Sequence, residues 1–149
     1  MEKIAVERTI WINARRERVW QAVTEPDQLS QWYATYYHWD IPALEVGTTV
    51  RFYNKDDQAD AQIATIEVVD PPREFTVRWQ PDKEYPEVSL ITSFLLVEEN
   101  GGTRATINES GYERLSDVVR QQWLEATGGG YTMSMENLRA YIEGSPLPY

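Results

Sequence analysis

The 149-residue sequence predicts an α+β fold in which an antiparallel sheet of about six to seven strands packs against one long C-terminal helix. Three observations carry this prediction. Residues 4–12 alternate apolar and polar side chains, as a strand does. Residues 46–110 repeat strand-like segments joined by short turns, which suit antiparallel pairing. Residues 116–143 place apolar side chains three and four positions apart, as one face of a helix does.

Two short helices are expected after the first strand. The apolar period becomes helical over residues 14–23, and Pro26 suits the first turn of a second helix that ends near Trp32 or Tyr33. The following segment, residues 36–39, is aromatic and has no regular period, so we interpret it as irregular. Further strands are expected near residues 47–53, 61–69, 75–79, 88–97 and 103–110.

The C-terminal helix is expected to begin at the N-cap Ser116 and to end at Gly144. Three consecutive glycines, residues 128–130, lie inside it, and each costs roughly 0.5–1 kcal/mol relative to alanine. This cost could be offset by a role of the glycines as a hinge, in a close approach of the backbone to a neighbour, or in keeping space open beneath the helix. We interpret the cluster as part of a helix that covers an aromatic-lined cavity, and we expect Gly129→Ala to weaken ligand uptake without lowering stability.

Composition excludes several classes of function. The net charge of −10 and the pI of about 4.6 argue against binding to nucleic acid or to an anionic membrane surface. No apolar run is long enough to cross a membrane, and the N-terminus does not resemble a signal peptide, so we expect a cytoplasmic protein. With no cysteine and one histidine, we expect no metal and no cofactor.

Short motifs along the whole chain resemble the START and birch-pollen-allergen (SRPBCC) superfamily, and most closely its branch of homologues of the activator of the heat-shock-protein-90 ATPase. The matching segments are residues 6–10 with 18–24, residues 26–32, residues 69–73 with Trp79, residues 101–112 and residues 130–142. The resemblance implies a single START-like domain over residues 1–149 with the helix-grip fold, in which a curved sheet wraps around the C-terminal helix. Gly130-Tyr131 replaces the family's usual Gly-Trp pair, and Gly128 and Gly129 are additional.

Glu109 is the carboxylate of most interest. If Ala105 and Ile107 face inward, strand alternation places Glu109 on the same face, where a buried carboxylate suits hydrogen bonding to a ligand or proton transfer. The single histidine, His38, is expected at a cavity rim as a ligand contact. We predict no catalytic residue, and the full set of predicted ligand-binding residues is Trp32, His38, Phe52, Trp79, Phe94, Glu109, Trp123, Gly130, Tyr131 and Met135.

These observations favour a non-catalytic protein that binds a small hydrophobic, aromatic or lipid-like molecule between the C-terminal helix and the sheet. One alternative is a cyclase or dehydratase type of enzyme that uses a buried acid or base. Another, implied by the resemblance, is a chaperone-binding module. A homodimer is compatible with the sequence, which does not decide the oligomeric state.

Overall fold

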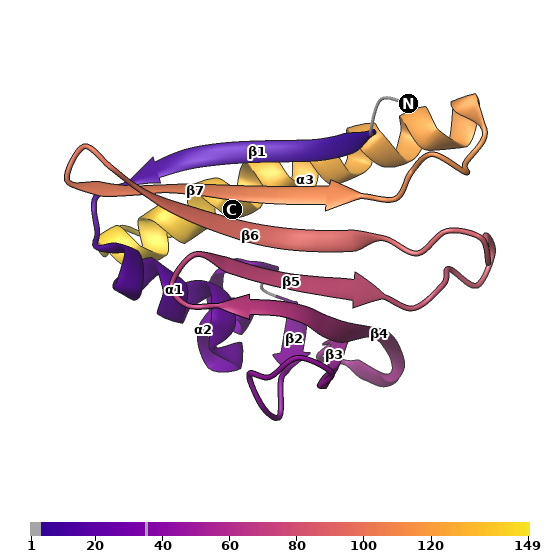
Figure 1. The fold of residues 1–149 in the computed structure, drawn as a ribbon, viewed down its shortest axis with the longest axis horizontal. Helices are drawn as coiled ribbons and strands as arrows, with labels where there is room; N and C mark the ends of the chain where they lie inside the picture. The colour runs from indigo at the N-terminus through magenta and orange to yellow at the C-terminus, as the bar shows by residue number, and fades with distance from the viewer. Residues whose placement is uncertain (1–3, 35) are drawn as a thin grey trace.

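In the computed structural model, seven strands form one curled antiparallel sheet, and a 27-residue helix runs along it behind β1 and β7 (Figure 1). The structure describes residues 4–34 and 36–149. The strands are β1 (Ala5–Ile12), β2 (Tyr37–Asp40), β3 (Thr49–Asn54), β4 (Asp57–Asp70), β5 (Glu74–Trp79), β6 (Ile91–Glu99) and β7 (Gly102–Ser110). The helices are α1 (Arg16–Thr24), α2 (Pro26–Trp32) and α3 (Asp117–Glu143).

The strand order is β1-β7-β6-β5-β4-β3-β2, and every neighbouring pair is antiparallel. The first strand therefore pairs with the last one, with Ala5 opposite Ser110 and Ile12 opposite Thr103. Helices α1 and α2 follow β1 and lie near one end of α3 (Figure 1). This arrangement confirms the predicted α+β class and the helix-grip architecture.

The prediction for residues 36–39 was wrong, because most of this segment is strand β2. Each β2 aromatic lies beside a partner on β3: Trp39 is opposite Phe52, and the Tyr37 and Phe52 rings stack with centroids 4.8 Å apart. Such cross-strand aromatic pairs stabilise an edge strand that lacks a simple alternating pattern. Two boundaries also differ, since β4 begins at Asp57 rather than 61 and β6 begins at Ile91 rather than 88.

Helix α3 begins and ends where its capping residues indicate. The Ser116 side chain accepts a hydrogen bond from the Val119 backbone N–H, and Gly144 closes the helix with a left-handed φ of 80°. The glycines at 128–130 lie inside the helix rather than at a break. A Cβ at Gly128 would lie 2.5 Å from the Arg8 guanidinium, so a close approach to β1 accounts for this glycine; Cβ positions at Gly129 and Gly130 meet open space.

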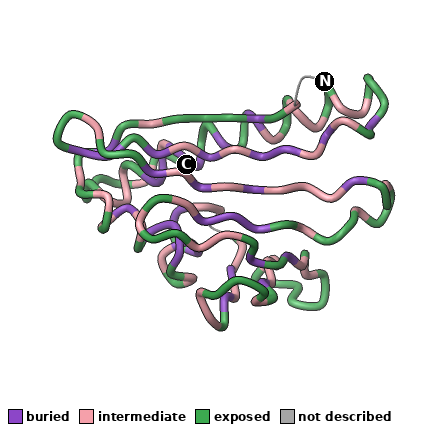
Figure 2. The backbone as a smooth tube through the Cα atoms, in the orientation of Figure 1, coloured by how far each residue is buried: buried purple, intermediate pink, exposed green. Residues whose placement is uncertain are grey.

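The hydrophobic core lies between the sheet and the three helices. Buried positions alternate along the central strands and recur on one side of the C-terminal half of α3 (Figure 2). Leu138 of α3, Ile107 of β7 and Trp32 of α2 are all fully buried in it. Among the described residues, no helix combines the length and the apolar character needed to cross a bilayer.

Candidate functional site

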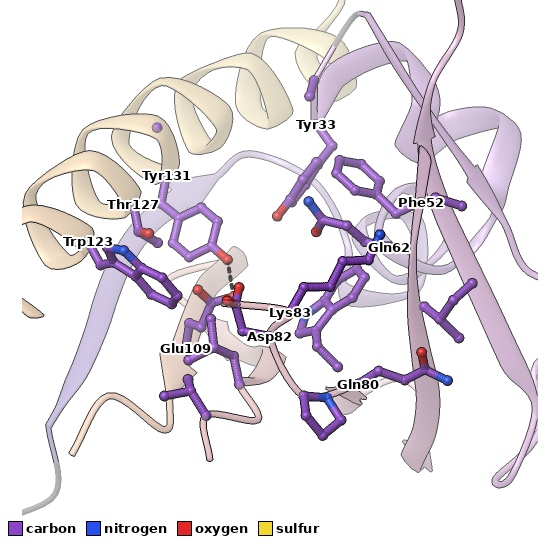
Figure 3. Close-up of a pocket in the computed structure, with 18 of the residues that line it drawn as sticks. Tyr33, Phe52, Gln62, Gln80, Asp82, Lys83, Glu109, Trp123, Thr127 and Tyr131 are labelled. Carbon is purple, nitrogen blue, oxygen red and sulfur yellow. Dashed lines mark hydrogen bonds between the residues drawn. The ribbon is translucent and has the colours of Figure 1, made fainter. Parts of the chain in front are cut away.

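A cavity of about 620 Å³ opens between the N-terminal half of α3 and the sheet (Figure 3). Its walls come from α3, from β3, β4 and β5, from the segment after α2 and from the loop between β5 and β6. Glu109 near the end of β7 contributes to its lining. The volume falls within the range of about 300–1,000 Å³ that is typical of sites for small molecules.

Five aromatic side chains line the cavity: Tyr33, Phe52, Trp79, Trp123 and Tyr131. The Tyr33 ring meets Phe52 edge to face at 5.8 Å, and Phe52 meets Trp79 at 6.0 Å. The rings of Tyr33 and Tyr131 lie 6.4 Å apart and connect the sheet side of the cavity to α3. These contacts hold the side chains of the wall in fixed orientations, so the cavity is preorganised.

Behind this wall lies Trp39, which packs against Tyr33, Phe52 and Trp79 at centroid distances of 5.2, 4.9 and 5.8 Å. Trp39 is buried, and its indole N–H has no hydrogen-bond partner among the described residues. Strand β2 therefore supports the cavity from outside without lining it.

Glu109 is the buried acid of the cavity, with 7% of its surface exposed. Strand alternation brings it to the same face as the buried Ala105 and Ile107. The Tyr131 hydroxyl donates to Glu109 Oε2 at 2.7 Å, and this bond joins α3 to the sheet (Figure 3). Thr92 Oγ1 donates to the same oxygen at 2.6 Å, while the Tyr112 hydroxyl donates to Oε1 at 2.5 Å.

A further hydrogen bond positions one of these donors. The Trp79 indole N–H donates to Thr92 Oγ1 at 2.9 Å, which leaves the Thr92 hydroxyl proton directed to the carboxylate of Glu109. Trp79 is also a wall of the cavity, so the aromatic lining and the acid belong to one hydrogen-bonded network. Networks of this kind fix side-chain positions more firmly than separate contacts do.

Three tyrosines around Glu109 retain their protons well above neutral pH. Burial is the main cause that raises the pKa of Tyr33, Tyr112 and Tyr131 above the ordinary tyrosine value, and the negative charge of Glu109 raises each pKa further. The three side chains therefore act at neutral pH as uncharged hydroxyl donors.

The rim of the cavity is polar. Asp60 of β4, Asp82 and Lys83 of the β5–β6 loop, and two glutamine side chains line its outer part. Asp82 Oδ1 accepts hydrogen bonds from the backbone N–H groups of Glu84 and Tyr85, at 2.9 and 3.0 Å, and so fixes the start of this loop. The cavity therefore combines an apolar wall, a buried acid and a polar mouth.

Residues 13–143 match the family model described as activator of Hsp90 ATPase homolog 1-like protein. The chain belongs to this family. No curated protein sequence matches it.

Solved structures place this family member among proteins of the same fold. The protein MLL2253 from Mesorhizobium loti superposes with a TM-score of 0.78 at 16% identity, over 97% of this chain and all of that one. The Aha1 dimer from Colwellia psychrerythraea gives 0.70 at 17% identity, over 94% and 96% of the two chains. CalU16 from Micromonospora echinospora gives 0.67 at 20% identity, over 95% and 85%. At these identities the likeness concerns the fold alone.

The structure divides the predicted ligand-binding residues into two groups. Those that line the cavity are Phe52, Trp79, Glu109, Trp123, Gly130 and Tyr131. Those that do not are Trp32, His38, Phe94 and Met135. Trp32, Phe94 and Met135 lie in the closed part of the core; the Trp32 indole N–H, for example, donates to the Ala22 carbonyl at 2.8 Å. His38 lies on β2, where its Nδ1 is 3.1 Å from Ser30 Oγ.

The glycine cluster contributes to the cavity through one residue. Gly129 and Gly130 are both exposed, but Gly130 lines the cavity and Gly129 does not. Residues 129 and 130 point about 100° apart around a helix, so adjacent glycines face different surroundings. We therefore expect a substitution at Gly130, rather than at Gly129, to weaken ligand uptake.

Sequence reasoning missed Tyr33, which lines the cavity, and Thr92 and Tyr112, which donate hydrogen bonds to Glu109. Tyr112 reaches Glu109 because Gly111, with φ of 114°, reverses the chain directly after β7. A Cβ at Gly111 would also lie 2.8 Å from the Ser89 carbonyl oxygen. The signal available in the sequence was Gly111, two residues after Glu109, because a glycine there allows the chain to turn back toward the acid.

Proposed function

We propose that this protein binds a small hydrophobic molecule in the cavity between α3 and the sheet, with a polar group of that molecule directed to Glu109. The observation that carries the proposal is the combination of a 620 Å³ cavity and a buried, hydroxyl-bonded carboxylate in its lining. Five aromatic rings supply the apolar contact area, and ring contacts are a large source of binding free energy.

The two neighbouring glycines of α3 offer a matched test. Both glycines are exposed with open space at their Cβ positions, but a leucine at Gly130 would stand in the cavity lining, while a leucine at Gly129 would stand outside it on the same helix turn. Both substitutions raise helix propensity, so both variants should fold. We expect the neutral fluorescent probe N-phenyl-1-naphthylamine to bind the unaltered protein with one probe per chain, and the Gly129→Leu variant equally well.

The Gly130→Leu variant should bind this probe at least tenfold more weakly. Native mass spectrometry of the freshly purified protein provides a second readout, since a retained molecule would add a discrete mass. Absence of probe binding to the unaltered protein, or equal binding by both leucine variants, would contradict the proposal.

One observation favours a second candidate, an enzyme that uses Glu109 and Tyr131 as acid and base. The two groups are hydrogen-bonded at 2.7 Å and both line the cavity, so a bound molecule could exchange a proton with either. Conversion of a bound compound that stops in a Tyr131→Phe variant, while its affinity is kept, would identify this activity. Loss of affinity alone would identify a binding protein.

The family description supports a test of chaperone binding, and a related structure supports a test of homodimer formation. The Colwellia relative is a dimer by its own structure. For this chain, light scattering on a size-exclusion column measures self-association directly, and a pull-down with purified heat-shock protein 90 measures chaperone binding.

A further inference from the structure

We infer that the molecule bound in this cavity carries a positively charged nitrogen, so that its chemical class is a hydrophobic amine or ammonium compound whose cation meets Glu109. The inference rests on the proposed binding function and adds the class of ligand to it. Four observations support it: Glu109 has no ion-pair partner among the described residues, its carboxyl group has a spare acceptor position, the cavity lining has an excess of acidic side chains, and aromatic rings line the same cavity.

Glu109 is a buried acid that forms no ion pair with the part of the chain that the structure describes. Its three hydrogen-bond partners, Thr92, Tyr112 and Tyr131, are all neutral hydroxyls. The ion pairs formed by the described residues do not include Glu109. Charged side chains that are this deeply buried normally have a partner of opposite charge, because removal from water costs several kcal/mol.

The hydrogen bonds to Glu109 leave room for one more donor. A carboxylate offers about four acceptor positions. Among residues 4–34 and 36–149, two donors reach Oε2 and one donor, the Tyr112 hydroxyl, reaches Oε1. Oε1 therefore keeps an acceptor position that an N–H group of a bound molecule could occupy.

The charge balance of the cavity disfavours an anionic ligand. Among the described residues that line it, the acids are Asp60, Asp82 and Glu109, and the basic side chain is Lys83. Lys83 is exposed on the β5–β6 loop, whereas Glu109 is the buried one of the four. A carboxylate or sulfate group would therefore meet repulsion next to Glu109, where the low dielectric strengthens it.

The aromatic walls add a second attraction for a cation. Trp79, Trp123 and Tyr131 line the same cavity as Glu109, and the Trp79 indole is joined to Glu109 through Thr92. Indole and phenol faces attract ammonium groups, most strongly where water is excluded. A ligand whose alkyl or aryl body packs on these rings, with its ammonium group at Glu109, would contact both the aromatic walls and the buried acid.

Three probes with one hydrophobic body and different head groups test the inference: 4-phenylbutylamine, 4-phenylbutanol and 4-phenylbutyrate. At pH 7 the first is a cation, the second is neutral and the third is an anion. Isothermal titration calorimetry on the full chain should give an affinity for the amine at least tenfold above that for the alcohol, with the carboxylate weakest. The Glu109→Gln variant should bind amine and alcohol equally.

The matched control is Glu125→Gln, which removes one negative charge from an exposed position of the same helix that carries Tyr131. This variant should keep the tenfold preference, so that a general charge effect is separated from contact with Glu109. If Glu109→Gln does not fold, a crystal structure of the unaltered protein with 4-phenylbutylamine decides instead. It should place the ammonium nitrogen within hydrogen-bond distance of Glu109 Oε1.

The outcomes separate the inference from the proposed function. Equal binding of the three probes, or preference for the carboxylate, would overturn the inference and leave the binding function intact. No binding of these probes or of N-phenyl-1-naphthylamine would overturn both. A preference for the amine that survives in Glu109→Gln would show that the cation binds elsewhere, and would also overturn the inference.

Discussion

Alanine substitutions at Gly128, Gly129 and Gly130 should have different effects on stability, although the three residues are consecutive in one helix. Gly129 is exposed, lies inside α3 and has open space where a Cβ would be placed. Gly129→Ala should therefore gain the full difference in helix propensity, about 1 kcal/mol in the free energy of unfolding. For a chain of this length, that gain corresponds to a rise in Tm of about 2–4 °C.

Gly130→Ala should raise the free energy of unfolding by a similar amount, since its Cβ position is also open. Gly128→Ala should give a smaller gain or none. Its methyl group would lie 2.5 Å from the Arg8 guanidinium, whose Nε donates to Thr132 Oγ1 at 3.0 Å. The Arg8 side chain is exposed and can move, but it must give up this hydrogen bond, which offsets part of the gain.

Urea denaturation and differential scanning calorimetry of the three variants measure this order directly. Equal gains at all three positions would show that the contact between Gly128 and Arg8 has no energetic consequence. A loss of stability in Gly129→Ala would refute the reasoning as a whole, because it would mean that residues 128–130 do not form regular helix in solution.

Two further predictions concern the tyrosines around Glu109. Because the pKa values of Tyr33, Tyr112 and Tyr131 are raised in the folded protein, the stability linked to them is fully present below about pH 10 and is lost as the pH rises further. Ultraviolet titration should therefore show three tyrosines that ionise only on unfolding. Complete titration of all tyrosines in the folded chain at about pH 10–11 would contradict this prediction. Tyr112→Phe should lower the free energy of unfolding by about 1–3 kcal/mol, because Glu109 Oε1 loses its donor; a loss below 0.5 kcal/mol in urea denaturation would mean that water replaces the hydroxyl.

Much of the fold could be predicted from the sequence because it depends on local patterns. Alternation predicts β1 and β7, the spacing of apolar residues predicts α3, and Ser116 and Gly144 mark its two ends. The pairing of β1 with β7 could not be derived in this way, since it joins residues about a hundred positions apart. Strand β2 was missed because its stability comes from contacts with β3 rather than from its own period.

The candidate site was predictable to the same extent. Alternation along β7 indicated that Glu109 faces inward, and the glycine cluster of α3 indicated a cavity beneath the helix. Whether an aromatic side chain lines the cavity or fills the closed core depends on how deeply it is buried in the folded chain. The sequence around Trp32, for example, does not indicate that this side chain is fully buried in the core. The hydroxyl partners of Glu109 come from three separate segments, so only the folded chain brings them together.

The sequence by itself determined the class of fold, the limits of α3 and the acidic, cysteine-free character of the protein, because these follow from residue type and short-range spacing. The tertiary structure decided which glycine of the cluster faces the cavity and which donors reach Glu109. It also showed that this acid has no cation beside it among the described residues. The physical reason is that burial, charge pairing and cavity shape depend on segments distant in sequence, whose approach is set by packing of the whole chain.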